Sequence, residues 1–158
     1  MQQLSILSEK PPARILCGFP GVGKTMLRAA APERFVDLDS SEFSRCRGRR
    51  EPRFPGNYID AMLFYPPSDG TLLVSTHQEV RTLLSAYDVA FGLVYPERRL
   101  RDEYLERFRR RGSPQEFVDL MAAQWDAFLD DLEREDRYSW RCVLGKNQYL
   151  VDATFWVD

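Results

Sequence analysis

The chain has 158 residues, of which 44% are hydrophobic, and this length suits one compact domain with one buried core. Its net charge of −2 argues against a protein that coats nucleic acid, although local cationic clusters are compatible with a nucleic-acid substrate. No apolar run approaches the roughly 20 residues of a membrane span, and the first ten residues lack the apolar core of a signal peptide. We therefore expect a cytoplasmic protein with no membrane partner and no obligate protein partner. Three cysteines without paired spacing predict neither a disulfide framework nor a zinc site.

Short apolar runs alternate with helical patterns along the chain. This alternation is typical of an α/β fold in which helices cover both faces of a parallel sheet. The expected strands cover about residues 13–17, 34–38, 71–75 and 90–95. Polar residues follow the second and third runs, and in such sheets the carboxyl ends of the strands line the ligand crevice.

Helix starts are indicated by local signals. A first helix is expected from about Lys24. Capping-box spacings at 76–79 and 113–116 predict two more helix starts, and the first of these places His77 in the first turn. Pro96 favours a further helix that Gly112 ends.

The end of the chain contributes one long helix and a closing element. The helix after residues 113–116 carries an apolar stripe that is expected in the core, formed by Phe117, Leu120, Met121, Gln124, Trp125, Phe128 and Leu132. The apolar segments 142–144 and 149–157 predict a closing strand or hairpin.

The strongest local signal is the sequence GFPGVGKT at residues 18–25, which fits the pattern G-x-x-x-x-G-K-[ST] between an expected strand and helix. Its glycines allow backbone N–H groups to converge on phosphates, its lysine reaches the β- and γ-phosphates, and its threonine binds magnesium. The pattern predicts a P-loop NTPase domain, of the nucleotide-kinase type, that binds ATP and Mg²⁺. The expected ATP-binding residues are Gly18, Gly21, Val22, Gly23, Lys24 and Thr25.

Other signals separate the classes that share this loop. The base-reading pattern N-K-x-D of a GTPase is absent from the sequence, since Asn147 follows Lys146 in the opposite order. The third apolar run ends in Ser75, where a motor ATPase usually has an acid. The acidic candidates are instead Asp37 and Asp39, at the end of the second run.

Asp37 and Asp39 are two residues apart, so they point to the same face of an extended strand. One of them can orient the acceptor hydroxyl while the other holds a magnesium-bound water. We expect Asp39, with Thr25, to serve the metal site. The alternative is that Asp39 or Ser40 only caps the next helix.

The region of about residues 96–113 is expected to form an arginine lid. Arg107 and Arg111 lie on or beside the inward face of its helix and are predicted to clamp phosphates as catalytic residues. Arg98 is a weaker candidate. The alternative for Arg107 is an intrahelical pair with Glu103.

An insertion at about residues 40–66 contains five arginines, followed by the sequence FPGNYIDAM. This cationic patch with aromatic residues suits a polyanionic acceptor such as single-stranded nucleic acid. The expected substrate-binding residues are Ser40, Arg49, Arg50, Asn57, Tyr58, His77 and Arg98. The alternative is a solvated loop followed by a short helix that Asn57 caps, with Tyr58 in the core.

The sequence resembles a family of phage-encoded P-loop kinases that phosphorylate 5-hydroxymethyluracil in DNA during thymidine hypermodification. The resemblance rests on GFPGVGKT, on FPGNYIDAM and on the segments 37–44, 72–84 and 93–114. It implies that the glycine-rich residues with Lys24 and Thr25 hold ATP and magnesium. It also implies acceptor and metal roles for Asp37 and Asp39, a lid role for Arg107 and Arg111, and DNA containing 5-hydroxymethyluracil as the partner.

Two further hypotheses remain open on the same residues. A kinase of free nucleosides or nucleoside monophosphates uses the same ATP site without needing the arginine patch. A non-catalytic nucleotide-binding module binds ATP and does not depend on Asp39. The segment 137–158 supplies no motif that separates these hypotheses.

Overall fold

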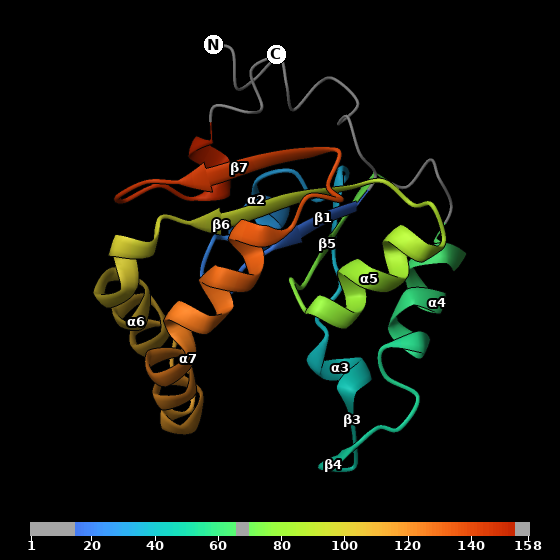
Figure 1. Cartoon of the computed structure of the whole chain (residues 1–158), viewed down its shortest axis with the longest axis horizontal. Coiled ribbons are helices and arrows are strands. Elements are labelled where there is room, and N and C mark those ends of the chain that lie inside the picture. Colours follow the sequence, from blue (N-terminus) through green and yellow to red (C-terminus); the bar gives the residue numbers. More distant parts are fainter. Residues whose placement is uncertain (1–14, 66–69, 154–158) are drawn as a thin grey trace.

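The core of the molecule is a parallel β-sheet (Figure 1). The computed structural model describes residues 15–65 and 70–153. Within them the sheet has five strands in the spatial order β2-β5-β1-β6-β7, namely Phe35–Asp37, Thr71–Val74, Ile15–Gly18, Phe91–Pro96 and Trp140–Leu144. Each pair of neighbours is parallel. The expected α/β class and its parallel sheet are confirmed.

Six helices, two 3-10 turns and one small hairpin complete the described fold. The helices are α2 (Lys24–Ala30), α3 (Ser41–Ser44), α4 (Gly56–Phe64), α5 (Gln78–Ala86), α6 (Arg101–Arg110) and α7 (Gln115–Arg134). The turns are η1 (Arg98–Leu100) and η2 (Leu150–Asp152), and the antiparallel hairpin is β3 (Arg45–Cys46) with β4 (Arg49–Arg50).

The direction of the connections distributes the helices over the sheet. The chain passes from β1 to β2 in one direction along the sheet, and it then runs from β2 through β5 and β6 to β7 in the reverse direction. Because such connections are right-handed, α2 covers one face and α4, α5 and α7 cover the other, as Figure 1 shows for the latter three. The order reverses at β1, and the crevice at this point is where parallel sheets bind ligands.

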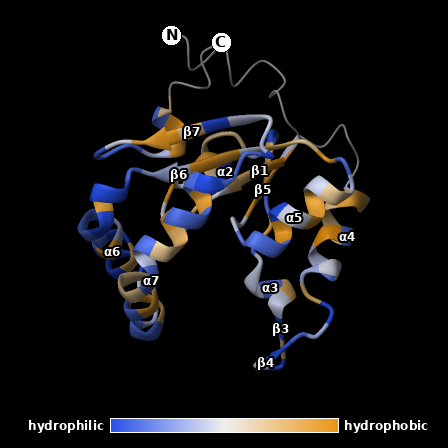
Figure 2. Ribbon diagram, viewed as in Figure 1, coloured by the Kyte–Doolittle hydropathy of each residue, from blue (hydrophilic) through white to orange (hydrophobic). Residues whose placement is uncertain are grey.

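The central strands are apolar because both of their faces are covered. β1, β5 and β6 are buried along their whole length, whereas the edge strand β7 alternates between partly buried and exposed residues until the buried Leu144. Gly92 in β6 lies beneath the indole of Trp140, which a Cβ atom would approach to 2.1 Å. Figure 2 shows α6, by contrast, as a mainly hydrophilic helix.

Several expected boundaries differ from the structure. The first strand begins at Ile15 in the described part of the chain, and residues 13 and 14 lie outside it. Neither expected capping box forms, because α5 begins at Gln78 after His77 and α7 begins at Gln115, without side-chain cap bonds. The Ser113 hydroxyl instead accepts a hydrogen bond from Arg111 Nε at 2.9 Å.

The closing hairpin was also wrong in part. β7 extends over Trp140–Leu144, but residues 150–152 form the turn η2, which packs beside α2. Residues 154–157 of the expected segment lie outside the described structure. None of the described helices combines the length and the apolar character needed to cross a membrane.

Helix α7 differs most from its expected stripe. The side chains that it buries are Val118, Met121, Trp125, Leu129 and Leu132. Leu120 is 50% exposed, Gln124 is exposed, and Phe117 and Phe128 are only partly buried. The helix therefore carries a second, partly exposed apolar face beside the one that enters the core.

Candidate functional site

The glycine-rich loop (residues 18–25) joins β1 to α2, and its conformation requires glycine at two positions. Gly21 and Gly23 have φ angles of 85° and 97°, in the left-handed region. A Cβ atom on Gly21 would lie 3.0 Å from the Phe108 ring, and one on Gly23 would lie 3.0 Å from the Tyr149 ring. Two aromatic rings thus pack closely against the backbone of this loop.

Lys24 provides the cationic group of the loop. Its ammonium donates a hydrogen bond of 2.6 Å to the carbonyl of Gly18. Burial lowers the pKa of Lys24 to about 8, against the attraction of Asp37 and Asp39, which raises it. A partly buried ammonium held between a backbone carbonyl and two nearby carboxylates is suited to exchange these contacts for those of an anion.

Thr25 and Asp37 form the clearest polar pair of the site. Thr25 Oγ1 donates a hydrogen bond of 3.0 Å to Asp37 Oδ2. Asp39 makes a different contact, because its Oδ1 accepts a hydrogen bond of 2.9 Å from the Ser41 amide at the start of α3. The expected partner of Thr25 was Asp39, whereas the residue that contacts the Thr25 hydroxyl is Asp37. The capping alternative for Asp39 is therefore present, although Asp39 also faces the cavity.

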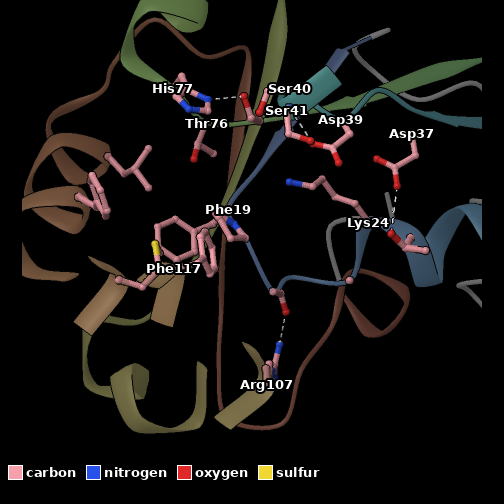
Figure 3. Close-up of a pocket in the computed structure, with 18 of the residues that line it drawn as sticks. Phe19, Lys24, Asp37, Asp39, Ser40, Ser41, Thr76, His77, Arg107 and Phe117 are labelled. Atoms are coloured by element: carbon pink, nitrogen blue, oxygen red, sulfur yellow. Dashed lines mark hydrogen bonds between the residues drawn. The ribbon is translucent and has the colours of Figure 1, made fainter. Parts of the chain in front are cut away.

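A large cavity of about 1210 Å³ opens beside this loop. One wall comes from β2, α3 and the start of α5, and the other from the end of α6 and from α7. Figure 3 shows Lys24 near Asp37 and Asp39, with Thr76 and His77 at one side and Phe19 and Phe117 at another. The lining residues used below are Lys24, Thr25, Asp37, Asp39, Thr76, His77, Arg111, Phe117, Leu120 and Phe128.

The turn after β5 brings a hydroxyl and an imidazole to the cavity. The Ser75 hydroxyl and His77 Nδ1 are 2.7 Å apart, and partial burial lowers the pKa of His77. Arg81 Nε donates to the Thr76 carbonyl at 2.9 Å, which fixes this turn. The Arg81 side chain is 1% exposed and also donates to Glu135 at 2.6 Å and to Asp131, both on the α7 side. Arg81 thus ties the two walls of the cavity together.

Arg107 braces the loop and also lines the cavity, so its expected role as a phosphate clamp stays a prediction. Its guanidinium donates to the carbonyls of Gly21 and Gln148 at 2.8 and 2.9 Å, and to Glu103 at 2.8 Å. It lies 4.3 Å above the Tyr104 ring centroid and 3.8 Å from that of Tyr149. With its donors engaged, Arg107 braces the loop, and the intrahelical pair with Glu103 is confirmed.

Arg111 faces the cavity one helical turn further on. It packs over the rings of Phe108 and Phe117 at 4.9 and 5.6 Å. It lines the same cavity as Lys24 and Asp39. Both expected lid residues therefore line the cavity, and they differ in their partners, because Arg107 bonds to the loop and Arg111 bonds to Ser113.

The structure separates several expected substrate-binding residues from the cavity. Arg98 bonds to Asp126, Asp130 and Glu133 of α7, on the outer side of that helix. Arg49 and Arg50 are exposed in the hairpin β4 and do not line the cavity. Figure 1 places this hairpin at the end of the arm that begins with α3.

Asn57 and Tyr58 both have structural contacts, and the alternative that places Tyr58 in the core is correct. Asn57 does not cap the helix, because α4 begins at Gly56 after Pro55. The Tyr58 side chain is buried, its hydroxyl donates to the Leu38 carbonyl at 2.5 Å, and it accepts from the Ser75 amide at 3.3 Å. Asn57 donates to the Phe43 carbonyl at 2.9 Å. Both residues hold the cavity wall in place from behind, whereas Ser40 and His77 line the cavity itself.

No sequence motif indicated that residues 149 and 150 pack against the glycine-rich loop. Tyr149 packs against Gly23 and Arg107, and the Leu150 amide donates to the Val22 carbonyl at 2.8 Å. Phe117 and Phe128 were assigned to the core, although both line the cavity. The apolar residues of α7 outside its core face are the sequence feature that could have indicated that these two rings line a cavity.

Comparisons with known proteins add little to this geometry. No family model and no curated protein matches the chain. Among solved structures, the chain is similar to an uncharacterized protein from Eubacterium ventriosum, at 15% identity and a TM-score of 0.40, over 90% of this chain and 93% of the other.

Proposed function

We propose that this chain is an ATP-dependent kinase with a P-loop NTPase fold, which transfers the γ-phosphoryl group of ATP to an alcohol hydroxyl. The observation that carries the proposal is the hydrogen bond between Thr25 and Asp37 beside the Lys24 ammonium. A hydroxyl, a carboxylate and a cation meet there at a glycine-rich loop. Phosphoryl transfer needs mainly this kind of positioning and charge neutralisation.

Magnesium fits the oxygen atoms at this place. The ion prefers hard oxygen ligands and is usually held by one or two protein groups together with phosphates and water. The Thr25 hydroxyl and the Asp37 carboxylate supply that set. When bound, the ion neutralises phosphate charge.

The remaining roles belong to side chains along the cavity. Lys24 is placed to stabilise the charge that develops on the transferred group, and Arg111 approaches from the other wall. Asp39 lies beyond Lys24 and is placed to accept a hydrogen bond from the acceptor hydroxyl, whose oxygen forms the new bond to phosphorus as the β–γ bridge breaks. The hydroxyl proton leaves through Asp39 to solvent.

The acceptor that we propose is the hydroxymethyl group of 5-hydroxymethyluracil in DNA. The support is the sequence resemblance, because the matching segments 37–44 and 72–84 contribute Asp39, Ser40 and His77 to the cavity. The exposed hairpin with Arg49 and Arg50 adds positive charge near the same arm. Since these two arginines do not line the cavity, a free nucleoside or nucleotide is the second candidate acceptor.

The test is transfer of labelled γ-phosphate from ATP, with Lys24→Ala as the control protein. Three acceptors are compared: DNA containing 5-hydroxymethyluracil, the same DNA with thymine, and free nucleosides and nucleotides. We expect label only on the hydroxymethylated DNA and none with Lys24→Ala. If only a free nucleotide is labelled, the acceptor is that nucleotide and not DNA. If ATP binds but no acceptor is labelled, the protein is a non-catalytic nucleotide-binding module.

A further inference from the structure

The second apolar face of α7 lies inside the cavity instead of the core. Phe117, Leu120 and Phe128, which we call the α7 wall, all line it. Leu120 is 50% exposed, so much of its side chain is open to the cavity. Apolar side chains gathered in a cavity indicate a surface that a ligand covers.

The α7 wall is held in a fixed position. The Phe117 ring meets the Phe108 ring edge to face, with centroids 5.1 Å apart and planes at 79°. The Arg111 guanidinium lies over Phe117 at 5.6 Å. A flat group that stacks on this wall therefore meets a preformed surface.

The charged and apolar parts of the cavity are separate. Figure 3 shows Lys24 and Asp37 on one side, Phe117 on the other, and Thr76 and His77 between them along one edge. The triphosphate belongs to the side with Lys24. The α7 wall is then left for a different part of the reacting molecules.

The edge beside the wall carries groups that suit a heterocycle. When the Ser75 hydroxyl donates to His77 Nδ1, the ring proton is on Nε2, which becomes a donor. Partial burial lowers the pKa of His77, which favours a neutral ring. The Thr76 hydroxyl can donate or accept. A nucleobase has the matching properties of apolar faces and a polar edge.

We propose that the α7 wall is the subsite for the acceptor base, which stacks on Phe117, Leu120 and Phe128 while Thr76 and His77 contact its edge. This inference rests on the proposed kinase function. It adds that the base enters the cavity, and therefore that a base within a duplex must first leave the stack.

The test combines two wall variants with a matched control. Leu120→Asn and Phe117→Leu alter the wall, whereas Leu63→Asn changes an equally exposed leucine on α4 that does not line the cavity. The acceptor is a single-stranded oligonucleotide with one 5-hydroxymethyluracil. We expect the acceptor KM to rise about tenfold in both wall variants, as loss of base stacking predicts. In both wall variants the Kd for ATP and the melting temperature stay near those of the wild type. Leu63→Asn changes neither the acceptor KM nor the Kd for ATP.

Each other outcome has a distinct meaning. An unchanged acceptor KM, or a rise in the Kd for ATP instead, overturns the subsite, and the latter assigns the wall to adenine. If the wild type transfers no phosphate, the kinase function has failed by itself. In that case binding of the oligonucleotide is compared with that of a strand that is abasic at the same position, and equal affinities overturn the subsite as well.

Discussion

Thr25 and Asp37 are joined by a hydrogen bond although they follow strands β1 and β2, which are not neighbours in the sheet. Strand β5 lies between them, and α2 crosses over it. The bond therefore connects the glycine-rich loop directly to the carboxyl end of an edge strand. This relationship selects Asp37, and not Asp39, as the partner of the loop threonine.

The two aspartates are expected to respond differently to substitution. Asp37→Asn should raise the Mg²⁺ concentration for half-maximal transfer by about 10- to 100-fold, since it alters the partner of Thr25. Asp39→Asn should lower kcat with little change in this Mg²⁺ dependence. Titration of transfer rate with Mg²⁺ at saturating ATP measures both. Equal shifts in the two variants would contradict the assignment.

Arg107 and Arg111 form a second contrasting pair. Arg107→Lys loses hydrogen bonds to the loop carbonyls, so its unfolding free energy should fall by about 1–3 kcal/mol, with weaker ATP binding. Arg111→Lys should keep its melting temperature and lose turnover. Thermal denaturation and steady-state kinetics separate the effects. A stable Arg107→Lys variant with lost turnover would instead support the lid interpretation.

Glu135 predicts a pH-dependent stability. Burial raises its pKa, but hydrogen bonds from Arg137 and Arg81 outweigh burial and lower the pKa to about 2, below the ordinary value of 4.5. Its stabilising contribution is therefore complete above pH 4.5 and is lost as the pH falls toward 2. Glu135→Gln should lower the unfolding free energy at pH 7 by about 1.5–3 kcal/mol and flatten this part of the profile.

The control for this prediction is a carboxylate two residues earlier, in the last turn of α7. Glu133 pairs with Arg98 at the surface, where its side chain is 46% exposed. Denaturant unfolding at several pH values should show little effect of Glu133→Gln, because exposed ion pairs contribute little. A similar loss in both variants would show that the buried network is not the cause.

The hairpin of β3 and β4, which carries Arg49 and Arg50, predicts that the acceptor KM depends on salt concentration only when the acceptor is DNA. Arg49→Ala and Arg50→Ala should each reduce the slope of log KM against log salt by about one, because each removes a phosphate contact. The exposed Arg28, on the opposite face in α2, is the matched control. A slope that is the same in all three variants would argue for a small acceptor held in the cavity alone.

The fold was predictable because each of its signals is local. The apolar run before Gly18 predicts a strand, and the glycine-rich pattern up to Thr25 predicts a loop and the start of a helix. The structure has these elements in that order. The same holds for β2, β5 and β6. The expected caps at Thr76 and Ser113 were each one residue early, since spacing alone cannot tell whether a hydroxyl bonds to the backbone.

The site was predictable only where its residues belong to that local pattern. Arg107 was placed on the correct face, but its partners, Gly21 and Gln148, lie 86 and 41 residues away in sequence. Tyr58 was expected to bind substrate and is in the core, whereas Phe117 was expected in the core and lines the cavity. An aromatic side chain suits a core and a cavity wall equally well. Only the packing decides between them.

The contacts between the glycine-rich loop and η2 also have a consequence for how the protein is made. The loop leaves the ribosome before Gln148 and Leu150, whose backbones bond to Arg107 and Val22, because those two residues lie more than 120 positions further along the chain. A nascent chain that stops short of Gln148 lacks these braces. The loop thus reaches its final shape only after the sheet on which it stands has been synthesised, and a product that is cut before Gln148 should hold this loop less firmly.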